Sequence, residues 1–393
     1  MIQTQYIFTG DTPQTITHSN SVTIKKVTTT EEFQVFYHLP WTVYHQDVYW
    51  VPPIWQETKD FFNQQNPFWS HAEAQLFIAY INNKPVGRIV GIIDHNFVKV
   101  EQHKIGYFGF FECRNDPVGA HALFTAVHDW LHAKKMTVMR GPINGRIDLC
   151  CGFMLQGFNE IPYLTTGYNP PYYNDLATSY GLHKATDLVS YKIDLTKPIP
   201  KQVQQVAQSC QQRGVCIRPF HRWRLPSELQ TWWYDLLSEV FKEHWGYAPA
   251  SYEEIRNRFG IKELPWIMNP RLFLVAEVDG TPIGFRWSMP DYNIVIQKLK
   301  GAIGPLGMLK FLGYKRRVSR GKFIMMGIKK DYRGQGIGTC MNYHTLVEMK
   351  RLGYTTAEYG WIEEHNIASR KAGEKIGGKL FKTYRIYETQ IHH

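Results

Sequence analysis

The sequence predicts an α/β (α+β) fold of two tandem lobes, each with a mixed central sheet flanked by helices. Two observations support this prediction. The chain of 393 residues is long enough for two ordinary domains, and one pattern of predicted strands and helices occurs twice along it. Hydrophobic residues make up 44% and aromatic residues 15% of the chain, which is enough to build packed cores.

The repeated pattern begins with a predicted β-hairpin in each half. Residues 76–87 and residues 273–284 both place two apolar runs around a turn. Further positions match at a common offset of 197: Pro85 and Pro282, Gly87 and Gly284, Asp94 and Asp291, Asn96 and Asn293. Several matches at one offset indicate an internal duplication.

The boundary between the lobes is predicted in the polar region 195–201, which contains two prolines. This gives an N-terminal lobe of residues 1–198 and a C-terminal lobe of residues 199–393.

In the N-terminal lobe, a predicted strand at 107–112 leads to a helix with a clear start. Asp116 is a good N-cap and Pro117 a good first helical residue. A carboxylate at this helix end would repel a phosphate group and occupy its donors, so we expect no phosphate ligand in this lobe. The helix should bury one stripe of residues: Ala120, Leu123, Phe124, Val127, Trp130 and Leu131.

The most informative stretch of the C-terminal lobe is 331–340, which reads DYRGQGIGTC. It follows an apolar strand at 323–328 and leads into an amphipathic segment. Its three glycines, Gly334, Gly336 and Gly338, allow the backbone to approach a ligand closely. The helix that follows offers free N–H groups and a positive dipole end, so the stretch predicts a cradle for a pyrophosphate.

The helix after this loop is predicted to end at Gly353. Its expected buried stripe is Ile337, Cys340, Met341, His344 and Val347. Since His344 lies on that stripe, we expect a packed histidine there and not a catalytic one.

The spacing Arg-x-x-Gly-x-Gly at 333–338 resembles motif A of the GNAT acyltransferases, which hold the pyrophosphate of acyl-CoA. After a predicted strand at 354–361, residues 363–378 resemble the fourth-helix motif of that family. The matching residues there are Asn366, Glu374, Lys375 and Gly377. The resemblance implies acyl-CoA as co-substrate and no metal. The residues expected to hold the donor are Met326, Gly327, Ile328, Arg333, Gly334, Gln335, Gly336, Ile337, Gly338, Thr339 and Asn366.

Further segments resemble a narrower group, the tandem-GNAT bacterial proteins of the bacterial ceramide synthase type. These segments are 66–72, 108–112, 168–173, 291–293 and 382–387. The resemblance implies transfer of an acyl group to a primary amine, with a long-chain sphingoid-type amine as acceptor. Acceptor-binding residues are expected at Trp245, Tyr247 and Asn293, although Trp245 and Tyr247 could equally belong to the core. The turn-rich segments 140–144 and 167–173 could wall the acceptor pocket or pack over the sheet.

Acyl transfer to an amine needs a base, and Glu358 is the first choice. It lies mid-strand in an apolar run, where burial is expected to raise its pKa. It could equally be the structural partner of an arginine such as Arg385. Alternative bases are Glu363, His365 and Asp291.

The leaving thiolate and the thioester carbonyl also need partners. Many GNAT proteins carry a tyrosine acid just before the residue that matches Glu374, but this chain has Gly373 there. Tyr384 or Tyr387 could take that role. Backbone N–H groups at 326–328 are expected to serve the carbonyl, because a bulge there would separate the strand from its neighbour.

The charge of the chain is positive and concentrated. The formal net charge is +11, and residues 292–330 hold ten Lys or Arg and no Asp or Glu. Within 292–322, apolar residues lie beside these charges, which suits an anionic membrane surface or a solvated loop with one buried side. No apolar run reaches 18 residues, and the six cysteines show no metal or disulfide spacing, so we expect a cytoplasmic protein, peripheral at the inner membrane if it binds lipid.

Two other functions remain open. A Fem-type aminoacyl transferase also uses paired GNAT folds, and +11 would suit tRNA phosphate, but it would not need the cradle at 333–338, so a nucleic-acid partner is not expected. A non-catalytic acyl-CoA or lipid sensor would explain the missing tyrosine at Gly373.

Overall fold

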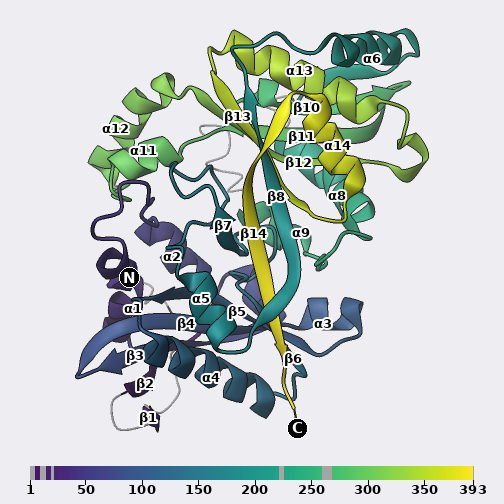
Figure 1. The fold of residues 1–393 in the computed structure, drawn as a ribbon. Helices are drawn as coiled ribbons and strands as arrows, with labels where there is room; N and C mark the ends of the chain where they lie inside the picture. Colours follow the sequence, from purple (N-terminus) through teal and green to yellow (C-terminus); the bar gives the residue numbers. More distant parts are fainter. Residues whose placement is uncertain (1–4, 9–14, 19–21, 221–224, 259–267, 393) are drawn as a thin grey trace. The chain divides into compact units, whose positions relative to one another are not determined.

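A computed structural model describes residues 5–8, 15–18, 22–220, 225–258 and 268–392 (Figure 1). The chain forms two compact units. Unit 1 consists of Met1–Leu188, Ile296–Phe311 and Thr383–His393, and unit 2 consists of Val189–Val295 and Leu312–Lys382. The predicted boundary in 195–201 stays a prediction. No described helix is long and apolar enough to cross a bilayer.

Unit 1 is a mixed sheet with helices. Its strands are β1 (Thr15–His18), β2 (Val22–Lys26), β3 (Ala72–Ile81), β4 (Lys84–Asp94), β5 (Ile105–Cys113), β6 (Val138–Gly141), β7 (Phe153–Gln156) and the second part of β14 (Gly378–Gln390). Its helices are α1 (Thr30–Val43), α2 (Trp55–Phe61), α3 (His95–Glu101), α4 (Pro117–Ala133) and α5 (Tyr173–Ser179). The strand order is β1-β2-β3-β4-β5-β6-β14, and β7 pairs with β14. β5 and β6 run parallel, and the other described pairs run antiparallel.

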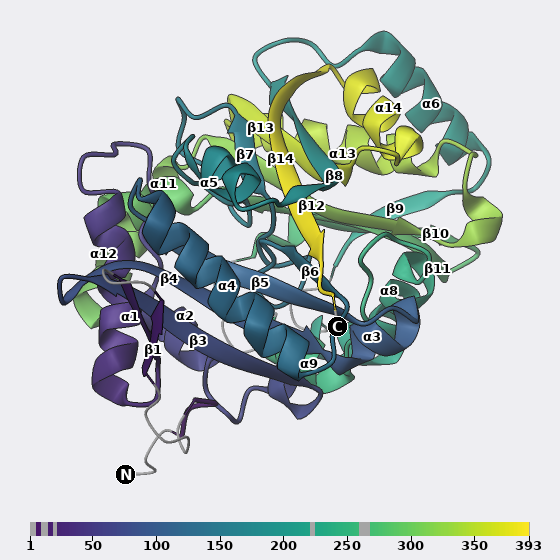
Figure 2. The same cartoon turned by 60° about the horizontal axis from the view of Figure 1, so that its bottom comes forward.

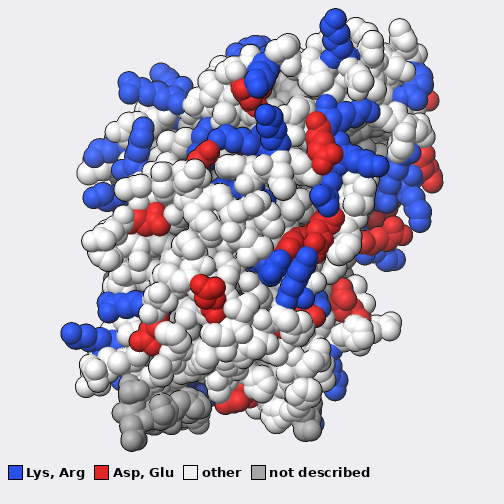
Figure 3. Space-filling model, viewed as in Figure 1, with Lys and Arg blue, Asp and Glu red and all other residues white. Residues whose placement is uncertain are grey.

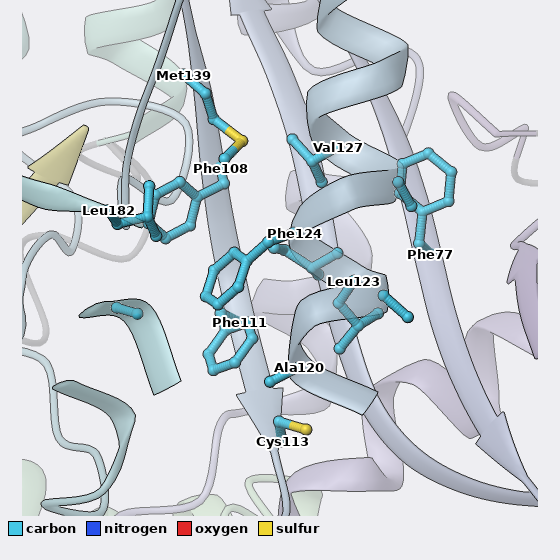
Figure 4. Packing of buried hydrophobic residues seen from close by; sticks show 14 of the residues in the cluster. Phe77, Phe108, Phe111, Cys113, Ala120, Leu123, Phe124, Val127, Met139 and Leu182 are labelled. Carbon is cyan, nitrogen blue, oxygen red and sulfur yellow. The ribbon is translucent and has the colours of Figure 1, made fainter. Parts of the chain in front are cut away.

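Helix α4 lies across one face of this sheet and builds the core of unit 1 (Figure 2). Its predicted cap is confirmed, because the Asp116 carboxylate accepts a hydrogen bond from the Gly119 N–H at 2.9 Å. The predicted stripe is buried, with Trp130 partly buried at its edge. Figure 4 shows Leu123, Phe124 and Val127 of α4 facing side chains of the strands. Each such buried side chain contributes roughly 1.5–3 kcal/mol.

The segment 167–173 packs onto β5. The hydroxyl of Tyr172 donates to the carbonyl of Cys113 at 2.9 Å, and that of Tyr173 donates to the carboxylate of Glu112 at 2.7 Å. Tyr173 is buried. These tyrosines therefore belong to the structure of unit 1.

Unit 2 has its own mixed sheet. Its strands are β9 (Cys216–Pro219), β10 (Phe273–Val278), β11 (Thr281–Pro290), β12 (Arg320–Ile328), β13 (Thr356–Glu363), the part of β8 (His183–Asp194) from Val189 onward, and the first part of β14. Its helices are α6 (Lys201–Gln212), α7 (Leu225–Glu228), α8 (Tyr234–Phe241), α9 (Tyr252–Arg258), α13 (Ile337–Arg351) and α14 (Ile367–Lys375). The strand order is β14-β8-β13-β12-β11-β10-β9, with β12 and β13 parallel. Helices α11 (Asn293–Lys298) and α12 (Pro305–Tyr314) contain residues of both units.

Helices cover both faces of the unit 2 sheet, and glycines mark the close contacts. A Cβ on Gly321 of β12 would lie 2.7 Å from Met349 of α13. A Cβ on Gly327 of the same strand would lie 2.4 Å from Val240 of α8. The first face also carries α14, which packs against Tyr359 of β13. We call the face that contacts Met349 the α13 face, and the face that contacts Val240 the α8 face.

The predicted stripe of α13 is partly wrong. Val347 is 42% exposed, and His344 is only half-buried. The buried face is wider than expected because α6 packs beside α13, with Cys210 in the same apolar cluster as the start of α13. The buried residues are Ile337, Cys340, Met341, Asn342, Thr345, Leu346 and Met349. The helix ends before Gly353, which has a φ of 79°, as predicted.

The two hairpins share irregular details. A β-bulge lies between Ala79 and Tyr80 in the first and between Ala276 and Glu277 in the second. The same offset of 197 relates the left-handed residues of the two turns, Asn82 with Asn83 and Asp279 with Gly280. Matching bulges and turns agree with the duplication predicted from the sequence.

Candidate functional site

The loop between β12 and α13 presents a row of open backbone N–H groups. Gly334 and Gly336 have φ values of 78° and 84°, which residues other than glycine rarely adopt. Gly336 is the N-cap of α13. Among the described residues, the N–H groups of 334–339 donate to no atom of the chain, whereas the next N–H, of Cys340, is bonded within the helix. The predicted anion cradle is therefore present as geometry, at the positive end of a 15-residue helix.

Helix α6 supports this loop from behind. Arg213, directly after α6, donates from Nη2 to the carbonyl of Gln335 at 2.6 Å. A Cβ on Gly336 would lie 2.8 Å from Cγ1 of Val206. Arg213 thus adds a positive charge beside the cradle without blocking its N–H groups. No local pattern predicts this role for Arg213, because the residue precedes the loop by more than a hundred positions.

Arg333 points away from the cradle. Its Nε donates to the carbonyl of Ile328 at 3.1 Å, and its Nη2 donates to the carbonyl of Val240 at 3.3 Å. Its Nη1 also lies 3.8 Å from Glu243. The side chain therefore fixes the start of the loop to β12 and α8, and its expected role in binding a ligand stays a prediction.

Strands β12 and β13 separate in front of the loop. Their parallel pairing runs up to Phe323 and Tyr359, while β12 stays paired with β11 as far as Ile328. The register between β11 and β12 shifts at Ile324, so an irregularity lies in the predicted strand, but the predicted position at 326–328 is wrong. Beyond the bulge, alternate N–H groups of β12 point away from β11, to the side where β13 has separated. We call this opening the V.

Glu358 is fully buried on β13, on the α8 face. Its Oε2 accepts from Nζ of Lys322, itself 1% exposed, at 2.8 Å. Its Oε1 has no hydrogen-bond partner among the described residues. The alternative of an ion pair with Arg385 is wrong, because Arg385 binds the carboxylate of Asp187 at 2.8 Å. Lys322 can hold the carboxylate in place while one oxygen remains available.

The other candidate bases differ in exposure. His365 is 82% exposed, and its Nδ1 lies 2.7 Å from Oε1 of the buried Glu363. Asp291 is fully buried and pairs with Nη2 of Arg320 at 2.6 Å. Ligand atoms of Glu363, Glu364 and His365 lie within 4.8 Å of one another, so the expectation of no metal stays a prediction.

Two of the residues expected to bind the acceptor follow α8, whereas Asn293 follows the end of β11 that pairs with the start of β12. Trp245 and Tyr247 are half-buried in the segment after α8. The neighbouring ring of His244 lies 6.5 Å from the ring of Trp361, beyond the point where β13 leaves β12. Burial lowers the pKa of His244 below its ordinary value of 6.5, so its imidazole is neutral at pH 7. Asn293 is 9% exposed, and its N–H donates to Asp291 at 3.3 Å.

The remaining candidates have structural contacts. Asn366 caps α14, accepting from the N–H of Ser369 at 3.1 Å. Tyr384 is 1% exposed and lies in unit 1, opposite Met154 of β7. Tyr387 donates to Asn174 at 3.0 Å, also within unit 1. None of these contacts tests the predicted roles.

Rings of neighbouring strands fill the space at Gly373. A Cβ there would lie 3.0 Å from the ring of Tyr359 and 3.2 Å from that of Tyr191. A tyrosine at this helix position would therefore collide with two tyrosines already present on β13 and β8.

Comparison with known proteins gives one consistent result. A family model described as "Acetyltransferase (GNAT) family" matches residues 233–377. The chain is 31% identical over 373 residues to "Bacterial ceramide synthase" of Caulobacter vibrioides (strain NA1000 / CB15N), covering 93% of this chain and 96% of that protein. It is 27% identical over 376 residues to "Protein YghO" of Escherichia coli (strain K12), covering 92% and 93%. A solved tandem GNAT protein from the clavulanic acid biosynthesis pathway matches with a TM-score of 0.55 at 10% identity, covering 95% and 99%.

Proposed function

Because the chain belongs to the GNAT superfamily, as a tandem-GNAT acyltransferase related to bacterial ceramide synthase, we propose that unit 2 moves a long acyl chain from CoA to a sphingoid-type primary amine. The observation that supports the donor site is the row of open N–H groups at 334–339. A diphosphate is the ligand group that such a row fits best. A tRNA-dependent aminoacyl transferase would not need this row, so we do not propose that alternative.

The V continues from the cradle into the sheet. β12 rises about 3.3 Å per residue, so the five steps from Ile328 back to Phe323 span roughly 16 Å. The pantetheine arm of CoA can cover such a span between a bound pyrophosphate and its sulfur. Gly327 has no side chain, so α8 can lie close to β12 there. Asn366 begins α14, the helix that follows β13.

We assign proton removal from the amine to Glu358, whose Oε1 is open and whose Oε2 is fixed by Lys322. The N–H groups of β12 between 326 and 328 that face the V would stabilise the charge on the carbonyl oxygen. Trp245 and Tyr247 would offer apolar surface to the acceptor, and Asn293 a polar contact. Tyr384 belongs to unit 1, so we assign it no part in this reaction of unit 2.

The proposed amine rests on the printed name of the Caulobacter relative and on a surface feature of this chain. Helix α12 exposes four large apolar side chains: Leu306 (77%), Leu309 (68%), Met308 (46%) and Leu312 (40%). Lys310, Arg316 and Arg317 are exposed beside them, and Figure 3 shows basic side chains at the upper left, where Figure 1 places α12. This combination suits an anionic lipid surface that could supply a lipid amine.

The donor site is tested by Gly334→Asp. Nothing lies within 4 Å of a Cβ at Gly334, so the substitution adds a carboxylate without a clash. Repulsion of about 3 kcal/mol should weaken acyl-CoA binding on the order of 100-fold. The matched control is Gly353→Asp, because Gly353 has nearly the same φ and equal space at the other end of α13. Calorimetry measures the affinity of each variant for palmitoyl-CoA. If the affinity falls equally in Gly334→Asp and Gly353→Asp, the loop at 334–339 is not the binding site of the pyrophosphate.

Acceptor class is tested by free-thiol release from palmitoyl-CoA with sphinganine, a short alkylamine and no amine. Turnover with sphinganine alone supports the proposal, and turnover with the short amine alone contradicts it. If the protein binds palmitoyl-CoA tightly but releases no thiol with any amine, the result favours a non-catalytic acyl-CoA or lipid sensor.

The lipid surface is tested by vesicle sedimentation. Replacing Lys310, Arg316 and Arg317 by Gln should weaken binding to phosphatidylglycerol vesicles, most strongly at low salt. The control replaces three exposed lysines of unit 1: Lys84, Lys104 and Lys135. Equal loss in both variants would mean that only net charge matters.

A further inference from the structure

Arg286 is a buried positive charge that has no paired carboxylate in the described part of the chain. It lies in the middle of β11 and is 3% exposed. Among the described residues, its Nε and Nη2 have no hydrogen-bond partner, and no carboxylate lies within ion-pair distance. Buried arginines normally have a paired anion, because the cost of an uncompensated buried charge is several kcal/mol.

The guanidinium lies at the inner end of the V. Its central carbon is 4.4 Å from the centre of the Phe323 ring and 4.8 Å from that of Tyr359. These two rings belong to the last paired residues of β12 and β13. The nearby Tyr359 partly opposes the effect of burial, because it raises the pKa of Arg286. The rings compensate part of the charge through their π faces.

The charge persists at physiological pH. Burial lowers the pKa of Arg286 to about 10, so the side chain stays protonated at pH 7. The aromatic shell therefore surrounds a cation and not a neutral base.

Further polar atoms are left open on the same α13 face. Ser288 of β11 is fully buried, and its Oγ has no partner in the described parts of the chain. Asn342 of α13 is also fully buried, with both side-chain amide atoms unbonded there. Polar groups left open in this way indicate a place for an external partner or for ordered water.

We propose that Arg286 is the counter-charge for the sulfur of CoA as the acyl group leaves it, an inference that rests on the proposed function. The amine nitrogen attacks the carbonyl carbon, a C–N bond forms, and the C–S bond breaks with its electron pair left on sulfur. The proton lost by nitrogen passes to the base and through solvent to the thiolate, so the products are an amide and free CoA. Arg286 keeps its proton throughout and lowers the energy of the thiolate by proximity of charge.

Other ionisable groups face this region. The ring of Tyr359 of β13 lies against Arg286. Tyr191 of β8 and Tyr359 both lie close to Gly373 of α14. The Tyr191 hydroxyl is engaged with Glu374 and Arg370 of α14. Lys322 and Glu358 lie on the opposite face of the sheet and neutralise one another.

The test measures the acidity of the thiol of bound CoA, by the ultraviolet absorbance of the thiolate as pH is raised. Desulpho-CoA provides the baseline for the tyrosines of the protein. Arg286→Met removes the charge and keeps an apolar side chain of similar length between the rings. We expect the native protein to hold the bound thiol at least about one pH unit more acidic than Arg286→Met does, and Arg286→Lys to keep most of this difference.

Two controls separate the possible failures. Arg88→Met removes a buried arginine of unit 1 and should leave the thiol titration unchanged. Arg286→Met should fold at least as stably as the native chain, since it removes an unpaired buried charge, and Arg286→Gln is a second neutral variant. Equal thiol acidity in the native, Met and Gln proteins overturns the inference. If the native protein does not bind CoA, the proposed function itself fails.

Discussion

Each unit buries an arginine in the second strand of its hairpin, at positions that do not match in the repeat, and the surroundings of the two arginines differ. In unit 1, Arg88 of β4 lies opposite Glu112 of β5, whose carboxylate accepts from Tyr44 at 2.8 Å and Tyr173 at 2.7 Å. In unit 2, Arg286 of β11 meets aromatic rings and no carboxylate among the described residues. The described part of unit 1 therefore supplies a carboxylate that interacts electrostatically with its buried arginine, whereas the described part of unit 2 supplies none.

The helix starts of the two units differ in the same sense. Asp116 caps α4 with a carboxylate, whereas Gly336 caps α13 with no side chain. One helix end is closed by the chain's own anion, and the other is open. From both differences we expect a ligand site in unit 2 and none at the start of α4 in unit 1.

The largest expected effect is a loss in the free energy of unfolding when Glu112 of unit 1 is replaced. Glu112→Ala removes the counter-charge of Arg88 and the acceptor of two buried hydroxyls, so it should cost about 3 kcal/mol in the free energy of unfolding. Urea unfolding measures it. Glu112→Gln keeps an acceptor oxygen and should cost much less. Equal losses in the two variants would mean that Glu112 only fills space.

The next effect is on turnover, in unit 2. Glu358→Gln should lower kcat on the order of 100-fold, the usual contribution of a general base, while the affinity for acyl-CoA stays unchanged. The same substitution in unit 1, Glu112→Gln, should leave kcat unchanged. Full turnover in Glu358→Gln would reduce Glu358 to the structural partner of Lys322 and move the base to His365 or Asp291.

A smaller effect is expected at the closed helix end. Asp116→Ala removes a cap and should cost about 1 kcal/mol of stability. It should not change the affinity for CoA, and calorimetry should still find a single CoA per chain. A second binding event would show that the cap alone had closed a working site in unit 1.

The smallest effect is a pH dependence. Burial raises the pKa of Glu112 above its ordinary value of 4.5, and nearby Arg88 only partly opposes this. A raised folded pKa favours the protonated form, so this contribution to stability is full below pH 4.5 and is lost as pH rises through the folded value. The slope cannot exceed about 1.4 kcal/mol per pH unit. Urea unfolding should show a flatter profile for Glu112→Gln, and an identical profile would contradict this assignment.

The sequence contained the local features of this fold and site. The glycine loop, the Asp116 cap, the Asn366 cap and the hairpin repeat all follow from residues that are close in the chain, since φ preferences and capping act over a few positions. The bulge was predicted in the right strand, but its position at Ile324 depends on the register with β11.

The missed features are those that depend on distant packing. Neither Arg213 behind the loop nor Arg286 at the V carries a local motif, and the partner of Glu358 is Lys322 on a neighbouring strand. The stripe on α13 was misjudged because α6 covers a second side of the helix. Periodicity shows that a helix has an apolar side, but not how many neighbours share it.

Two strands carry residues of both units, and this limits how the protein can be divided. If the chain were cut after residue 198, the C-terminal fragment would lack the part of β8 that belongs to unit 2. That part includes Tyr191 and its hydrogen bonds to α14. The other fragment would lack Thr383–His393, which brings Tyr387 and Ile391 into the core of unit 1. Neither fragment keeps a complete sheet, so expression of either half alone should yield aggregates.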